Sequence, residues 1–133
     1  MTKSGAAADI LIAGGGTAGL TAALAIAASA PDLGVEVVDA RPPEAGERDE
    51  RASAIAAAAR RMLDRLGVWD KIRAEAEPIL SMEITDSRTG DAVRPVFLTF
   101  DTAVSDGEPF AYMVPNEPLA AALRRRWRPP ESS

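Results

Sequence analysis

Hydrophobic and polar positions change their spacing along the first forty residues of the chain. Residues 9–13, Asp-Ile-Leu-Ile-Ala, form a nearly continuous apolar run, which is typical of a strand buried on both faces of a parallel sheet. The run ends in three glycines, and residues 17–29 are mostly alanine and leucine, which favour a helix. A Pro-Asp-Leu-Gly segment breaks this helix, and residues 35–39 predict a second strand. The pattern therefore predicts a strand, a glycine turn, a helix and a strand.

The spacing changes again after a polar loop at 40–50. A second helix is expected over 51–66, because five apolar residues there share one helical face while charged residues occupy the rest. These five are Ile55, Ala59, Met62, Leu63 and Leu66. Further on, Leu80, Met82 and Ile84 alternate with polar residues, which is the period of a strand. An antiparallel hairpin is therefore expected over 79–100.

The last part of the chain predicts one more helix. Asn116 is a good helix cap, and residues 116–126 carry leucines at helical spacing. The segment then runs into arginines, a proline pair and two serines, so 124–133 is expected to be an irregular tail. The chain is expected to be one partial domain over 1–123 followed by that tail.

Composition and charge narrow the range of functions. A chain of 133 residues is long enough for one domain, and its net charge of −5 argues against nucleic-acid binding, which needs a basic surface. Arg124–Arg128 with Trp127 is accordingly interpreted as a solvated charge run. The sequence has no cysteine and no histidine, which leaves no thiolate chemistry and none of the commonest metal ligands. The four acidic residues between 44 and 50 are interpreted as a solvated loop, and no metal site is expected.

The glycines that follow the first predicted strand form a motif that is known for binding dinucleotides. Gly14, Gly16 and Gly19 have the spacing GxGxxG between the first predicted strand and helix. Such a turn lets the backbone approach a pyrophosphate, and the N-terminus of the helix favours its negative charge. Asp39 ends the second predicted strand, where a carboxylate can accept the hydrogen bonds of ribose hydroxyls. Plain turn glycines and a plain strand end are the alternative, but the strand, helix, spacing and acid together favour a dinucleotide site.

The order of the later elements favours FAD over a nicotinamide as the bound dinucleotide. A nicotinamide-binding domain would continue its alternation of strands and helices after the second strand, whereas a loop, one helix and an antiparallel pattern follow here. Five stretches of the chain are also informative, and they begin at Ile10 (ILIAGGGTAGL), Val37 (VVDAR), Asp49 (DERASAI), Leu66 (LGVWD) and Phe110 (FAYMVPNEPL). In these stretches the chain resembles the FAD-dependent aromatic-ring monooxygenases related to p-hydroxybenzoate hydroxylase, and among them the ubiquinone-biosynthesis hydroxylases.

The resemblance implies an α/β fold: the N-terminal part of a Rossmann-like FAD/NAD(P)-binding domain, with the start of an antiparallel substrate-domain sheet. It also implies roles for individual residues, with the glycines at the FAD pyrophosphate, Asp39 at the ribose, and Arg51, opening the second helix, reaching the cofactor. For Arg51 a solvated arginine, for Asn116 a helix cap and for Arg41 a surface arginine remain alternatives. The complete set of expected cofactor-binding residues is Gly14, Gly16, Thr17, Ala18, Gly19, Asp39, Ala40, Arg41, Arg51 and Asn116.

The activity that the resemblance implies is hydroxylation of an electron-rich ring. FAD would supply the chemistry, NAD(P)H the electrons and O2 the oxygen, and no catalytic side chain is assigned in this chain. The substrate is expected to be a small aromatic molecule, with a prenylated quinone precursor as one form that the resemblance allows. A cytoplasmic location is expected, with peripheral membrane association of the full-length enzyme as a further option.

Two segments that the family carries downstream, one Asp-Gly and one Gly-Asp, are not found in these residues. The chain is therefore expected to be an N-terminal fragment that does not hydroxylate by itself. A different flavoprotein oxidoreductase and a non-catalytic FAD-binding fragment stay open as alternatives.

Overall fold

The computed structural model describes residues 8–41, 49–85, 90, 92, 95–100 and 107–127. The first of these segments holds strand β1 (Ile10–Ala13), helix α1 (Thr17–Ser29) and strand β2 (Val35–Val38). The two strands are parallel, with Ile10 opposite Val35 and Ala13 opposite Val38. The helix has the range that the sequence predicts, and each strand is one residue shorter.

The prediction that the first strand is buried on both faces is wrong for this structure. Leu11, in the middle of β1, is 62% exposed. Strand β1 pairs only with β2 among the described residues, and α1 packs on this two-stranded sheet. One helix covers only one face, so the side chains on the other face remain accessible.

The predicted helix over 51–66 is also partly wrong, because its first part is a strand. Strand β3 covers Ala52–Ala56, and helix α2 begins only at Ala57 and ends at Arg65. Strand β3 pairs antiparallel with β7 (Ala111–Pro115) along its whole length. The backbone hydrogen bonds of this pairing outweigh the helix preference of alanine, which is a weak local effect.

The centre of the molecule is a three-stranded antiparallel sheet in the order β3-β7-β4, where β4 is Glu77–Ile79. Two short 3-10 turns, η2 (Trp69–Lys71) and η3 (Arg73–Glu75), connect α2 to β4. Strand β7 leads directly into α3 (Asn116–Arg126), so this sheet fixes where α3 begins.

Helix α3 extends into the segment that the sequence predicts to be an irregular tail. Residues 124–126 form the last turn of α3, so the irregular tail does not begin at 124. Residues 128–133 of that tail lie outside the described part of the chain.

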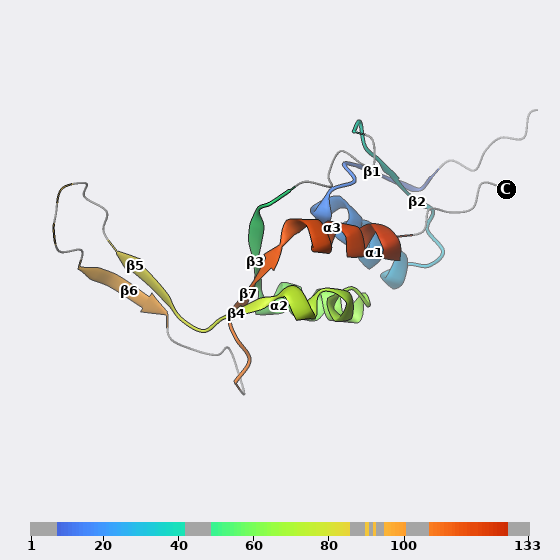
Figure 1. The fold of residues 1–133 in the computed structure, drawn as a ribbon. Helices are drawn as coiled ribbons and strands as arrows, with labels where there is room; N and C mark the ends of the chain where they lie inside the picture. The colour runs from blue at the N-terminus through green and yellow to red at the C-terminus, as the bar shows by residue number, and fades with distance from the viewer. Residues whose placement is uncertain are drawn as a thin grey trace, which may run out of the picture.

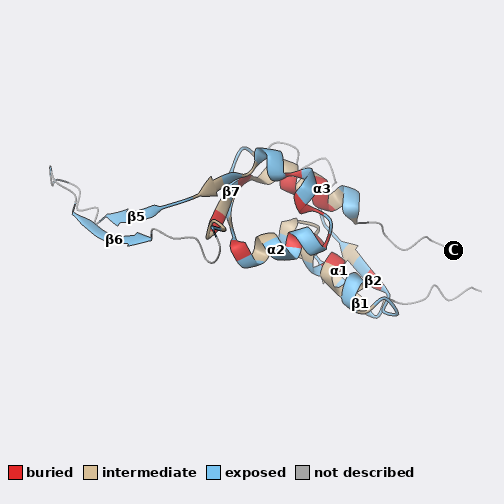
Figure 2. Cartoon of the chain, turned by 90° about the horizontal axis from the view of Figure 1, so that it is seen from below, coloured by how far each residue is buried: buried red, intermediate tan, exposed pale blue. Residues whose placement is uncertain are grey.

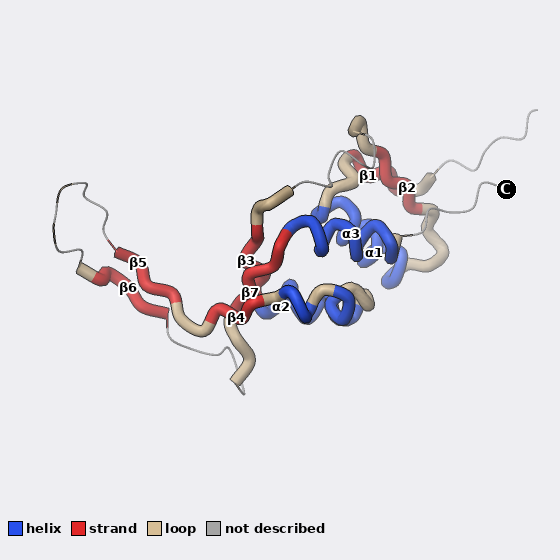
Figure 3. Tube along the Cα trace, viewed as in Figure 1, coloured by secondary structure: helices blue, strands red, loops and turns tan. Residues whose placement is uncertain are grey.

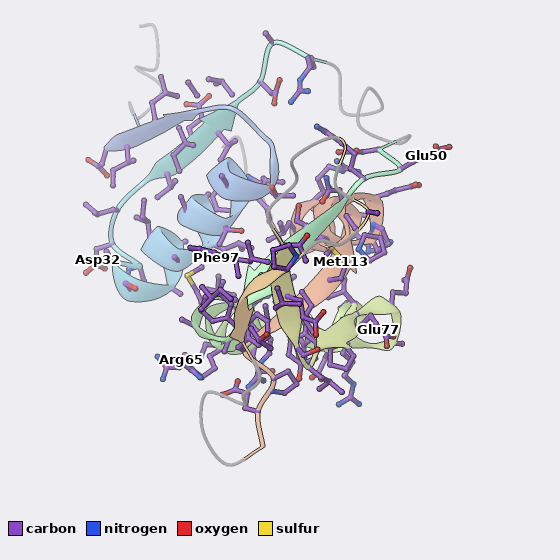
Figure 4. The ribbon with its side chains drawn as sticks, turned by 90° about the vertical axis from the view of Figure 1, so that its left-hand side faces the viewer. Asp32, Glu50, Arg65, Glu77, Phe97 and Met113 are labelled. Carbon is purple, nitrogen blue, oxygen red and sulfur yellow. The ribbon has the colours of Figure 1, made fainter. Side chains whose placement is uncertain are left out.

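A separate antiparallel hairpin is formed by β5 (Met82–Thr85) and β6 (Val96–Phe100). It projects away from the rest of the chain (Figure 1), and all of its strand residues are exposed (Figure 2). Phe97 projects from β6 where the hairpin faces the viewer (Figure 4) and is 80% exposed. The expected hairpin over 79–100 therefore starts later than predicted, because Ile79 pairs with β7 instead. Most residues of its turn, 86–89, 91 and 93–94, lie outside the described part of the chain.

The hydrophobic core lies where α1, α2, η2, β7 and α3 meet, and the buried residues in Figure 2 gather there. Val68, Val114 and Leu123 are completely inaccessible. Within the described part of the chain, no helix combines the length and the hydrophobicity needed to cross a membrane. The buried core residues are Leu20, Leu24, Leu63, Leu66, Val68, Trp69, Ile72, Val114, Leu119, Ala122 and Leu123.

Candidate functional site

The glycine motif forms a tight turn between β1 and α1. Gly14 has a φ of +116°, a conformation that side chains disfavour, and its N–H donates to the carbonyl of Val38 at 2.7 Å. The turn therefore begins directly at the end of the β1–β2 pair, as the expected role of Gly14 requires.

Gly16 and Gly19 differ in what surrounds them. A Cβ atom at Gly19 would lie 1.8 Å from the carbonyl oxygen of Gly14, so the absence of a side chain allows α1 to pack against the turn. A Cβ at Gly16 would meet no heavy atom of the described residues within 4 Å. The two glycines are therefore suited to two purposes, Gly19 to close packing and Gly16 to an open approach from outside.

The N-terminus of α1 is available for an anion. Its first residues are Thr17 and Ala18, and neither an acidic residue in the first turn nor a capping side chain among the described residues satisfies its N–H groups. Free N–H groups and the helix dipole both favour a negatively charged ligand at this point. The open space at Gly16 lies at the same end of the helix. These features fit the pyrophosphate of a dinucleotide.

Asp39 reaches back from the end of β2 to the glycine turn. Its Oδ2 atom accepts the N–H of Gly15 at 2.7 Å, and its Oδ1 atom accepts the N–H of Arg41 at 2.8 Å. These two backbone donors lower the pKa of Asp39 below its ordinary value, and Arg41 contributes more than Gly15. Ala40 and Arg41 are exposed beside it, and the Arg41 Nε atom lies 3.5 Å from Asp39 Oδ1. The acid is thus held as a carboxylate next to the turn.

Arg51 does not open a helix, which corrects the expectation from the sequence. It lies directly before β3, and its side chain is 82% exposed. Its Nε and NH2 atoms donate to Oδ1 and Oδ2 of Asp49 at 2.7 and 2.8 Å. The exposed Glu50 lies between them in the sequence, at the approach to β3 (Figure 4). Arg51 and Asp49 therefore form a two-pronged ion pair.

Asn116 is not the cap of α3, so the helix-cap alternative is wrong. Pro115 occupies the cap position, and no side-chain hydrogen bond caps this helix within the described residues. The amide of Asn116 instead donates to Asp49 Oδ2 at 3.0 Å, and its Oδ1 atom accepts the hydroxyl of Ser53 at 2.6 Å. The backbone N–H of Asn116 also donates to the carbonyl of Arg51 at 2.9 Å.

Asp49 and Ser53 are members of this cluster that the sequence did not reveal. The sequence predicts that Asp49 belongs to a solvated acidic loop, but the guanidinium of Arg51, followed by the amide of Asn116, holds the pKa of Asp49 well below its ordinary range. The same ion pair raises the pKa of Arg51. Ser53 and Asn116 are 63 residues apart, so only the pairing of β3 with β7 brings them together. The spacing Asp-x-Arg at 49–51 was the one local signal.

An apolar cavity of about 460 Å³ lies between α1, β3, α2 and α3. Thr17 and Ala18 from the start of α1, Ile55 from β3 and Leu119 from the first turn of α3 all line it. The segment that leads into β3 lies on the side of the molecule where α1 and α3 begin (Figure 3). The helix that follows the glycine turn and the two elements that follow Arg51 and Asn116 therefore share one apolar cavity. The lining itself is too apolar for a pyrophosphate, which points to the turn outside the cavity as the place for phosphates.

Comparisons with known proteins identify the family to which the chain belongs. The family model of the FAD binding domain matches residues 7–127. The ubiquinone hydroxylase UbiL of Rhodospirillum rubrum is 40% identical over 122 residues, which is 90% of this chain and 27% of that protein. The chain thus spans about a quarter of the length of this relative.

One solved structure shows a similar fold. The p-nitrophenol 4-monooxygenase PnpA from Pseudomonas putida DLL-E4 matches with a TM-score of 0.56 over 88% of this chain and 27% of that chain. The two sequences are 21% identical over the match.

Proposed function

The chain belongs to the FAD binding domain family, and we propose that it forms the Rossmann-like, FAD-binding portion of a flavoprotein monooxygenase. One observation carries the cofactor assignment. A helix N-terminus that no described side chain caps, an open glycine and a carboxylate from the neighbouring strand lie together at one turn. A pyrophosphate needs the first two features, and a ribose needs the third.

The proposed roles follow from this geometry. Backbone N–H groups at Gly16, Thr17 and Ala18 would bind the pyrophosphate, since the helix leaves them free. Asp39, flanked by Ala40 and Arg41, would accept the hydroxyl groups of the adenosine ribose. Arg51, directly before β3, and Asn116, at the start of α3, would approach a different part of the cofactor. When bound, FAD supplies the redox chemistry, and the residues of this chain bind and orient it.

We further propose that the substrate is a small aromatic ring, of the class of ubiquinone precursors, and that NAD(P)H supplies the electrons. The support for this class is the 40% identity to a ubiquinone hydroxylase over 90% of the chain. The hairpin β5–β6 would begin the sheet that faces the substrate. The described side chains at the glycine turn and around Asp49 account for the nucleotide, and none of them is assigned to the ring of the substrate.

The experiment that tests the cofactor assignment is a titration of the purified chain with FAD, followed by quenching of flavin fluorescence. Saturable binding that AMP or ADP weakens by competition is expected, because both would occupy the adenosine part of the site. FAD binding that ADP leaves unchanged, or no binding at all, would contradict the assignment.

A second candidate function is FAD binding without hydroxylation by this chain alone. The exposed apolar hairpin favours it, because in these residues nothing covers the strands that would face a substrate. A flavin open to water loses its reactive forms before they reach a substrate. NADH or NADPH oxidation and phenol hydroxylation are measured with the chain, FAD and a set of phenols. Product formation coupled to nicotinamide oxidation would exclude this second function.

A further inference from the structure

Asp49 lies between two residues that come from distant parts of the chain and that are both proposed to reach FAD. Its carboxylate accepts three hydrogen bonds from Arg51, two from the guanidinium and one from the backbone N–H, and a fourth from Asn116, which is 67 residues away. Among the described residues, Asp49 is the ion-pair partner of Arg51. The Arg51 side chain is long and 82% exposed even with this ion pair, so without Asp49 many of its rotamers would be accessible.

The same carboxylate determines the orientation of the Asn116 amide. A carboxylate can only accept hydrogen bonds, so the NH2 group of Asn116 must face Asp49. The oxygen of the amide then faces Ser53, and the Ser53 hydroxyl must donate to it, as the 2.6 Å distance indicates. An amide has two N–H groups, and the described residues engage one of them, so the second can serve a ligand.

The structure assigns Asp49 a positioning role, one that rests on the proposed function: it holds the Arg51 guanidinium and the Asn116 amide in the orientation in which they bind FAD. Asp49 is assigned no contact with the cofactor, because its carboxylate oxygens already accept hydrogen bonds from Arg51 and Asn116. Its effect on binding is exerted through Arg51 and Asn116, whose order it establishes before FAD arrives.

The direction in which a substitution at Asp49 changes FAD affinity distinguishes this positioning role from a purely electrostatic effect. FAD is an anion, so removing a negatively charged side chain from the site would by itself strengthen FAD binding. Removing the positioning contacts would weaken it, because ordering a flexible arginine on binding costs affinity, about three- to tenfold for one side chain. We expect Asp49→Asn to weaken FAD binding within that range. Asp49→Ser also removes the carboxylate and should weaken FAD binding as well. It keeps the test possible if Asp49→Asn does not fold.

A matched control is available in a second aspartate–arginine pair. Asp70 lies 3.6 Å from Arg73 on the exposed surface of the η2–η3 segment, outside the proposed site. Asp70→Asn should leave the FAD affinity within twofold of the unsubstituted chain. Melting temperatures of all variants without FAD are measured alongside, since a structural role alone would lower stability without acting through Arg51.

A double-mutant cycle supplies the decisive readout. If Asp49 acts through Arg51, most of the effect of Asp49→Asn on FAD affinity should disappear when Arg51 is already replaced by Gln. An equal loss in both backgrounds would overturn the positioning role, and so would unchanged or tighter binding by Asp49→Asn.

One further measurement separates this inference from the proposed function. If the unsubstituted chain binds no FAD, the cofactor assignment fails, and the NMR signal of the Arg51 Nε–H still tests the contact. A slowly exchanging signal that Asp49→Asn removes is the result expected for a held guanidinium. The same rapid exchange in both proteins would overturn the positioning role independently of FAD.

Discussion

The side-chain carboxylate of Asp39 accepts the backbone N–H of Gly15 at 2.7 Å, across 24 residues of sequence. The same carboxylate accepts the N–H of Arg41 with its other oxygen. Both oxygens are therefore in use, and the acid joins the end of β2 to the glycine turn after β1. It has one function in shaping the turn and a second, proposed function in binding ribose.

The first prediction concerns Asp39→Asn. An asparagine has a single side-chain oxygen, so one of the two N–H groups loses its acceptor and faces an NH2 group instead. The ribose would also lose a charge-assisted acceptor, and we expect FAD affinity to fall on the order of tenfold or more. Fluorescence titration with FAD measures the change.

Asp9 provides the control for this substitution. Its Oδ2 atom accepts the N–H of Gly34 at 2.7 Å, which is the same kind of contact at the opposite end of the β1–β2 pair. Asp9→Asn should therefore leave FAD affinity unchanged. An equal loss in both variants would mean that Asp39 acts only on the stability of the sheet.

The second prediction is that Gly16→Ala abolishes FAD binding and leaves the fold intact. Gly16 has a φ of −77°, which alanine adopts freely, and a methyl group would meet no described atom within 4 Å. The methyl group would occupy the space proposed for the pyrophosphate. An unchanged melting temperature together with the loss of FAD binding is expected, and retained affinity would remove Gly16 from the site.

The third prediction is that Gly19→Ala destabilises the fold itself. Alanine in a helix gains about 1 kcal/mol over glycine. The new Cβ would lie 1.8 Å from the carbonyl oxygen of Gly14, however, and relieving overpacking of this kind costs typically 1–3 kcal/mol and sometimes more. The clash is with backbone, which cannot rotate away, so we expect a net loss of stability in urea unfolding. A more stable variant would show that α1 can shift away from the turn.

The first half of the site, the glycine motif with its flanking elements, could be predicted from the sequence. The motif and its flanking strand and helix depend on residues close together in the chain, and α1 has the expected range. Local preferences decide such elements, since a glycine at positive φ and a run of alanines need no distant partner.

The second half of the site could not be predicted in the same way. Ala52–Ala56 has the composition of a helix, and it becomes a strand only because Ala111–Pro115 pairs with it from far along the chain. The contacts of Ser53 and Asp49 with Asn116 depend on that pairing. Periodicity within a short window contains no information about such partners, so the roles of Asp49 and Ser53 emerge only from the structure.

The fourth prediction concerns pH and an ion-pair group away from the proposed site. Glu108, before β7, accepts hydrogen bonds from Arg60 and Arg61 of α2, both at 2.7 Å. These contacts lower the pKa of Glu108 below its ordinary value of 4.5, and the hydrogen bond from Arg60 contributes most to the shift. Arg60 also lies 6.0 Å from the centre of the Trp69 ring, so the group connects to the core.

The direction of the pH effect follows from that shift. At pH values well above 4.5 the carboxylate is ionised in the folded and unfolded states, and its full stabilisation is present. As the pH falls through 4.5, the unfolded chain takes up the proton first, and this stabilisation is lost until the folded pKa has been passed. Asp39 and Asp49, whose pKa values are also lowered, add to the loss in the same acidic range.

Glu108→Gln removes this one contribution at every pH. We expect the variant to have a lower urea midpoint than the unsubstituted chain at pH 7, and the difference to shrink toward pH 3. Glu75→Gln is the control, since Glu75 is exposed in η3 and forms no ion pair among the described residues, and it should shift the midpoint little at either pH. Asp64, 3.8 Å from Arg60, can compensate only in part because it is itself half exposed. A difference between the chain and Glu108→Gln that stays constant from pH 7 to pH 3 would mean that Glu108 contributes by packing and not by its charge.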